Sequence, residues 1–271
     1  MSKSPAFRIV EGAETAQNPD VIVALPVIRE VAELLLDCAA TGGVGLVTGP
    51  SGSGKTIALK RLAARYPTLG LPGQVIYSCC QVAVGATRGC KDLLSEMGVG
   101  GIIANGHGAP MQLVIKIAQR EFVRRNIRCA LLDEIDRWDD EAIAGLFALH
   151  DRLREGGHSF SLVLASNQAS PSWLTDAESL RSRTLRNVGA ERVSVEEMVG
   201  ILAMWSAEFA SFAAKLEAGH AEAVQIAHIL HDATAGDLRQ LNFFARVYER
   251  HFHGREVSEK MVKAALMKLD A

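Results

Sequence analysis

The sequence predicts an α/β fold: a parallel sheet flanked by helices, followed by a C-terminal domain made of helices alone. Up to about residue 194, short apolar stretches alternate with segments whose apolar residues recur every three or four positions. This alternation is typical of a parallel sheet with helices on both faces. From Val195 onward the helical spacing dominates. We therefore expect an N-terminal arm over residues 1–24, an α/β domain over 25–194 and a helical domain over 195–271.

Local patterns mark the elements before residue 194. Strands are predicted at short, largely apolar stretches, one in the arm and four in the α/β domain: Phe7–Val10, Val44–Val47, Gln74–Cys79, Ile127–Leu132 and Phe160–Ala165. Helices are predicted where apolar residues keep the helical spacing: Val27–Cys38, Ile57–Arg65, Thr87–Met97, Met111–Asn126 and Glu141–Leu153. The two kinds of element alternate along the chain, which is the order that a parallel sheet requires.

The C-terminal domain is predicted to contain four helices. Their spans follow from apolar residues at helical spacing: Met198–Phe212, Ala221–His231, Asp237–Phe252 and Ser258–Leu269. The segment Asp232–Gly236 is expected to separate the second helix from the third, because Gly and Asp favour turns.

Composition and charge exclude several classes of protein. The chain has 271 residues, 48% of them apolar, which is enough for a sizeable core in one or two domains. Its 29 Lys and Arg against 31 Asp and Glu give a net charge of −2. A uniformly basic coat for nucleic acid is therefore excluded, although a local basic patch is not. The longest apolar stretch, Val21–Ile28, is far shorter than the about 20 residues of a membrane-spanning helix. We therefore expect no membrane association.

The N-terminus and the cysteines indicate a cytoplasmic protein. Residues Met1–Pro5 lack the apolar core of a signal peptide. The chain has five cysteines and no C-x-x-C pair, which favours reduced thiols over disulfides or zinc ligands.

A glycine-rich segment after the second predicted strand carries the strongest signal for chemistry. It matches the pattern G-x-x-x-x-G-K-[ST] with Gly49, Pro50, Ser51, Gly52, Ser53, Gly54, Lys55 and Thr56. The glycines allow successive backbone N–H groups to face a phosphate, and the following helix N-terminus favours negative charge. We expect Lys55 to reach the β- and γ-phosphates of ATP and Thr56 to ligate Mg²⁺.

Two carboxylates end a later apolar strand. Asp133 and Glu134 follow Ala130–Leu132 directly. Asp133, at the end of the strand, is predicted to hold Mg²⁺, and Glu134 to polarise the water that attacks the γ-phosphate.

Polar residues further along the chain complete the predicted site. Asn167 follows the next apolar strand, where an amide can orient the attacking water. Arg181 and Arg183 precede the helical domain, and Arg239 opens one of its helices. An arginine near the nucleotide can neutralise charge that develops on the γ-phosphate.

The order of these motifs resembles the AAA+ ATPase family: a phosphate loop, the D-E pair, the strand-end Asn, the S-R segment and the G-x-x-R segment. The resemblance covers about residues 25–255. It implies that Lys55 and Thr56 are the Walker A residues and that Asp133 and Glu134 are the Walker B residues.

The same resemblance implies roles for the remaining polar residues. Asn167 matches sensor 1 and Arg239 matches sensor 2. Arg183 matches the arginine finger that is offered to a neighbouring subunit, and Arg181 is the alternative.

Within the family, two segments resemble the branch that contains replication initiators and transposition ATPases. These segments are Thr87–Gly98, with the loop and basic helix that follow, and Gly236–Leu241. The nearest resemblance is to the family of the Mu-type phage transposition B proteins and their transposon relatives. It implies duplex DNA, a transposase and further copies of the same chain as partners, assembled as an ATP-dependent ring or helical filament. The residues before the α/β domain are too few for the N-terminal helix-turn-helix domain of the phage Mu protein.

Four basic residues outside the nucleotide site are predicted DNA contacts: Arg88, Lys91, Arg152 and Arg154. With a net charge of −2, they would act as a local stripe repeated around an oligomer.

We therefore expect an ATPase that assembles on duplex DNA and regulates transposition, through target selection and transposase activation. One alternative is a replication initiator or helicase loader of the same superfamily. The other is a secretion- or signalling-associated ATPase without a role at nucleic acids.

Overall fold

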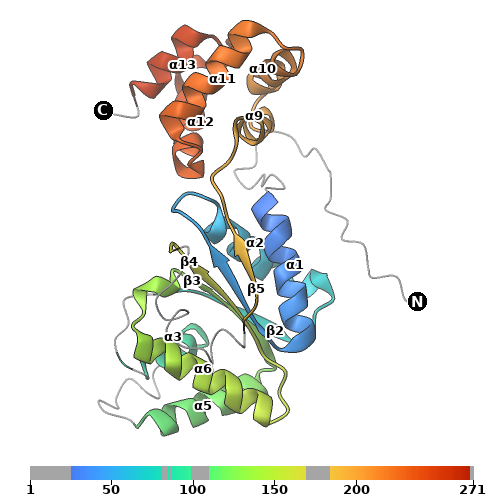
Figure 1. Ribbon diagram of the computed structural model, residues 1–271, viewed down its shortest axis with the longest axis vertical. Coiled ribbons are helices and arrows are strands. Elements are labelled where there is room, and N and C mark those ends of the chain that lie inside the picture. Colours follow the sequence, from blue (N-terminus) through green and yellow to red (C-terminus); the bar gives the residue numbers. More distant parts are fainter. Residues whose placement is uncertain (1–25, 81–84, 86, 99–109, 169–183, 269–271) are drawn as a thin grey trace, which may run out of the picture. The chain divides into compact units, whose positions relative to one another are not determined.

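The computed structural model describes residues 26–80, 85, 87–98, 110–168 and 184–268 (Figure 1). These residues fall into two compact units, which are described separately. The α/β unit lies within residues 27–191, and the helical unit contains residues 192–268. The predicted arm and its strand Phe7–Val10 lie outside the described residues.

The α/β unit is built on a five-stranded sheet with the order β2-β3-β4-β1-β5, in which every neighbouring pair is parallel. Its strands are β1 (Val44–Thr48), β2 (Gln74–Cys79), β3 (Ile127–Asp133), β4 (Ser161–Ser166) and β5 (Thr184–Gly189). This confirms the predicted fold class and four of the predicted strands within one residue at each end. The carboxyl ends of β1, β3 and β4 therefore lie at the same edge of the sheet.

Sequence analysis missed the fifth strand, β5. Four of its six residues are exposed, namely Leu185, Arg186, Asn187 and Gly189, and Val188 is its buried residue. An edge strand of this kind lacks the apolar run that identifies a buried strand. Its pairing with β1 depends on a neighbour that is about 140 residues away in the sequence.

Helices cover both faces of the sheet (Figure 1). One face carries α1 (Pro26–Thr41) and α2 (Lys55–Arg65), and the other carries α3 (Arg88–Glu96), α5 (Met111–Arg124) and α6 (Asp140–Glu155). All five correspond to helices that the sequence predicts, within three residues at each end. Short 3₁₀ helices, η1 (Tyr66–Leu69) and η2 (Ile135–Arg137), follow α2 and β3.

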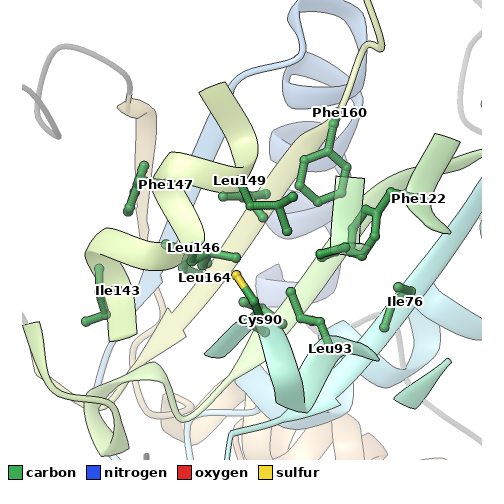
Figure 2. Close-up of a cluster of buried hydrophobic side chains, with 14 of the residues drawn as sticks. Ile76, Cys90, Leu93, Phe122, Ile143, Leu146, Phe147, Leu149, Phe160 and Leu164 are labelled. Atoms are coloured by element: carbon green, nitrogen blue, oxygen red, sulfur yellow. The ribbon is translucent and has the colours of Figure 1, made fainter. Parts of the chain in front are cut away.

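The main core lies between the sheet and helices α3, α5 and α6 (Figure 2). Phe122 of α5 and Phe160 meet edge to face, with ring centroids 5.1 Å apart. Near the start of α3, Gly89 packs against the buried ring of Trp138. A Cβ atom on Gly89 would lie 2.4 Å from that ring, so the approach of α3 to this part of the chain depends on a glycine.

The helical unit contains α9 (Val195–Ala203), α10 (Ala207–Glu217), α11 (Ala221–Thr234), α12 (Leu238–Phe252) and α13 (Glu259–Leu266). Its core includes the rings of Phe209, Phe244 and Tyr248, whose centroids lie 5.0–6.1 Å apart. None of the described helices in either unit is long and apolar enough to cross a membrane.

Two predictions for this unit are wrong. The predicted helix Met198–Phe212 is two helices, because the side chain of Ser206 accepts a hydrogen bond from the Phe209 backbone N–H and begins a new helix there. The predicted break Asp232–Gly236 starts too early, since α11 continues to Thr234. The buried hydroxyl of Thr234 donates to the Leu230 carbonyl at 2.9 Å, which satisfies it within the helix.

The contact between Gly89 and Trp138 gives a test of the packing. We expect Gly89→Ala to lower the free energy of unfolding of the α/β unit by about 1–3 kcal/mol, because the new methyl group overlaps a buried ring. The matched control is Gly200→Ala in α9, where an added Cβ meets nothing within 4 Å. That change should stabilise its unit by up to about 1 kcal/mol through helix propensity. Scanning calorimetry measures both, and equal effects at the two positions would contradict this packing.

Candidate nucleotide-binding site

The predicted phosphate loop connects the carboxyl end of β1 to the start of α2. Its three glycines have positive φ angles: 152° at Gly49, 82° at Gly52 and 93° at Gly54. A Cβ atom on Gly49 would lie 2.0 Å from the carbonyl oxygen of Ala190. Glycine is therefore required at position 49 by close approach as well as by backbone conformation.

The Lys55 ammonium lies beneath this loop. The side chain is 6% exposed, and Nζ donates to the carbonyl oxygens of Gly49 and Pro50 at 2.7 Å each. It also lies 3.4 Å from Ser53 Oγ, and Ser53 Oγ donates to the Pro50 carbonyl at 2.9 Å. The loop is thus curled around a buried positive charge.

The first turn of α2 supplies backbone donors at the same place. Its N-cap is Gly54, which has no side chain to accept from the first N–H groups of the helix. The positive end of the helix dipole and the Lys55 charge therefore coincide. This donor set, in a loop that curls around the Lys55 ammonium, fits the phosphates of a nucleotide.

The predicted acidic pair stands at the same edge of the sheet. Asp133 ends β3 and is 1% exposed. The Tyr77 hydroxyl donates to Asp133 Oδ2 at 3.3 Å, and the Glu134 backbone N–H donates to Oδ1 at 3.0 Å. Burial, followed by the charge of Asp133, raises the pKa of Tyr77, so its hydroxyl remains a donor at neutral pH. β4 lies between β3 and β1, which separates Asp133 from the phosphate loop by about 10 Å at ordinary strand spacing.

Glu134 is held by two side chains that sequence analysis did not single out. Its backbone is left-handed, with φ 57°. Its Oε2 forms an ion pair with Arg137 Nη2 at 2.8 Å and accepts from Cys79 Sγ at 3.5 Å. Burial, followed by the charge of Glu134, raises the pKa of Cys79, which keeps the thiol protonated and able to donate.

The signals for these partners are weak in the sequence. Arg137 follows Glu134 by three residues, and Cys79 is the last residue of a predicted strand. The pairing of Cys79 with Asp133 in the sheet register brings the thiol to the carboxylates, and that register is a tertiary property.

Asn167 directly follows β4 and is exposed. Its backbone N–H donates to Asp136 Oδ1 at 3.0 Å, which joins the end of β4 to the segment after β3. The structure therefore brings Asn167 to the edge that carries the carboxylates.

The predicted arginines fall in different places. Arg181 and Arg183 lie outside the described residues. Arg239 is in the helical unit, exposed in the first turn of α12. Asp237 caps that turn by accepting from the Arg239 and Gln240 backbone N–H groups at 2.7 and 3.3 Å.

The four predicted DNA contacts do not form one cluster in the α/β unit. Arg88 begins α3, and its neighbour Gly89 packs on Trp138, so Arg88 lies near the start of α6. Arg152 and Arg154 are in the last turn of α6, at its other end. At 1.5 Å per residue, the start and end of that helix are about 20 Å apart.

Two of these residues also have local partners. Arg88 forms an ion pair with Asp92 at 3.1 Å, and Arg152 donates to Gln112. Lys91 is half-buried and Arg154 is exposed.

Comparisons with known proteins agree with this geometry. Residues 39–170 match the family described as AAA domain. No curated protein sequence matches the chain. The fold is similar to the Aeropyrum pernix ORC2 protein in its ADP form, with 18% identity over 93% of this chain and 70% of that chain and a TM-score of 0.62.

Two further solved structures share the fold. Cdc6p from Pyrobaculum aerophilum has 15% identity over 92% of this chain and 69% of that one, with a TM-score of 0.64. Drosophila ORC bound to DNA has 16% identity over 100% of this chain and 71% of that chain, with a TM-score of 0.59.

Proposed function

We propose that the AAA domain within residues 39–170 is an ATPase and that the protein is a replication initiator or helicase loader that uses ATP to bind duplex DNA. One observation supports the ATPase most directly. A glycine loop curled around the buried Lys55 ammonium shares a sheet edge with the carboxylates of Asp133 and Glu134.

In this proposal, each residue has one task. The phosphate loop and the α2 N-terminus bind the phosphates. When they bind, Lys55 gives up its hydrogen bonds to the Gly49 and Pro50 carbonyls and contacts the phosphates instead. Thr56 and Asp133 would hold Mg²⁺, which when bound neutralises charge on the β- and γ-phosphates. Glu134 orients the water that attacks the γ-phosphorus and accepts its proton as the bond to the β-phosphate oxygen breaks.

Support for a role at DNA comes from the structural neighbours. They include the replication-initiator proteins ORC and Cdc6, and the Drosophila ORC structure is bound to DNA. These likenesses favour the initiator alternative over the transposition role. Transposition, with a transposase as partner, remains a prediction from the order of the sequence motifs.

We further propose that the chain assembles with copies of itself. The support is the sequence resemblance, in which Arg183 or Arg181 is offered to the site of a neighbouring subunit. A ring and a helical filament both satisfy this arrangement.

Two substitutions separate ATP binding from hydrolysis. We expect Lys55→Ala to abolish the rise in melting temperature that ATP produces, because the phosphates lose their buried cation. Glu134→Gln should keep that rise but slow turnover by about 10²–10⁴-fold, since the water loses its base. Thermal shift and phosphate-release assays measure these effects. Unchanged turnover in Glu134→Gln would contradict the catalytic role.

The ion pair between Arg137 and Glu134 provides a finer test. The Arg137 side chain is half-exposed, and an exposed ion pair contributes about 0.2–1 kcal/mol. The pair therefore competes only weakly with the interaction between Glu134 and the attacking water. We expect Arg137→Gln to raise basal ATP turnover by up to about fivefold without changing the thermal shift by ATP. Arg137→Lys, which can keep the pair, is the matched control. Slower turnover in Arg137→Gln would show that Arg137 supports the reaction instead.

DNA binding is tested by fluorescence anisotropy with a random-sequence duplex, with ATP, with ADP and without nucleotide. We expect binding with ATP that falls steeply with salt, by a log–log slope of about −0.9 for each phosphate contact. The Lys55→Ala variant should bind weakly under all three conditions. No binding by the wild-type protein with ATP at low salt would favour an ATPase without a role at nucleic acids.

A further inference from the structure

Helix α12 of the helical unit presents a basic stripe to solvent. The buried side of the helix includes Leu241, Phe244 and Tyr248, which pack into the core of this unit. The positions farthest from that buried side recur at spacings of four, three and four residues. They are exposed and form the stripe defined by Arg239, Phe243, Arg246 and Arg250.

The charge of the stripe is strongly one-sided. Three of its four side chains are arginines, and none of its positions is acidic. The acidic residues on or beside α12 lie at its borders: Asp237 caps the helix N-terminus, and Glu249 lies toward one flank of the stripe. Beyond the C-terminal end of α12, Glu208 accepts from the Gly254 backbone N–H and faces His253. The Arg246 guanidinium donates to Asn242 Oδ1 at 3.0 Å, a contact that leaves its charge uncompensated.

Phe243 adds an aromatic ring to the middle of the stripe. Its side chain is 49% exposed, and it is the one aromatic residue among the exposed large apolar residues of the described chain. Its neighbour Phe244 is fully buried and supplies the aromatic side chain that packs into the core at this turn, so the core does not use Phe243. An exposed ring between arginines has little to contact on a duplex backbone, whereas an unpaired base can stack on it.

The length of the stripe fits one nucleic-acid strand. From Arg239 to Arg250 the helix rises by about 16 Å. Along one strand, phosphates follow one another every 3.4 Å of helix axis in a duplex, and farther apart when the strand is extended. The Arg246 and Arg250 guanidinium groups, about one helical turn apart, can therefore bind neighbouring phosphates of one strand, while Phe243 takes a base beside them.

We propose that α12 binds single-stranded DNA, with Arg246 and Arg250 on phosphates and Phe243 stacked on an unpaired base. This inference rests on the proposed function of the protein at DNA, and it adds a second form of DNA and a second surface. Arg239, at the start of the stripe, is predicted to contact nucleotide and is left unchanged in the test.

The test measures the anisotropy of a labelled oligothymidylate and of a labelled random-sequence duplex with the full-length protein and ATP. We expect the double variant Arg246→Gln, Arg250→Gln to bind the single strand about tenfold or more weakly at 0.1 M salt. Its log–log salt slope for the single strand should flatten by about 1.4, for two lost phosphate contacts at about 0.7 each. The matched control is Lys260→Gln, which removes an exposed positive charge from α13 and should change neither value.

Substitutions of Phe243 separate stacking from charge. We expect Phe243→Leu to weaken single-strand binding about 5- to 100-fold, whereas Phe243→Tyr keeps the ring and retains binding. Because the side chain is half-exposed, melting temperature and basal ATP turnover should stay unchanged in both variants.

The outcomes distinguish this inference from the function on which it rests. Duplex binding that fails in the wild-type protein would overturn the proposed function. No single-strand binding by the wild-type protein, or equal single-strand binding by the stripe variants and Lys260→Gln, would overturn the inference. A loss in Arg246→Gln, Arg250→Gln that Phe243→Leu does not share would also overturn it, since charge alone would then carry the contact.

Discussion

The phosphate loop keeps its shape because the backbone of Gly49 lies directly against the backbone of Ala190. The Ala190 N–H donates to the Thr48 carbonyl at 2.6 Å, and a side chain at position 49 would overlap the Ala190 carbonyl. This contact joins the end of β1 to the end of β5 where the loop begins. The curl of the loop around the Lys55 ammonium begins directly after this contact.

The two carboxylates of the site are held by contacts of different strength. Asp133 is buried and held by a hydroxyl and a backbone N–H, so its position is fixed by the sheet. Glu134 is held by an ion pair and a thiol, both weaker and more exposed contacts. In the proposed mechanism, a firmly held magnesium ligand, Asp133, therefore stands beside a loosely held base, Glu134, and turnover can respond to small changes near Arg137.

Positive charge is distributed unevenly for a protein with a net charge of −2. In the α/β unit, the basic residues at the start of α3 lie far from those at the end of α6, and two of them, Arg88 and Arg152, have local partners. In the helical unit, α12 gathers three arginines and an exposed phenylalanine on one line. A slightly acidic chain can thus carry a concentrated basic surface without a basic composition.

The sequence by itself determined the features that depend on neighbouring residues. Four strands, the phosphate loop and the acidic pair after β3 are local patterns, since apolar runs, glycines and strand ends are read within a few positions. Tertiary structure alone decided the rest. β5 is a polar edge strand that exists through its pairing with β1. Cys79 reaches Glu134 because β2 and β3 are in register. Each of these features depends on a partner whose position is fixed only when the chain folds.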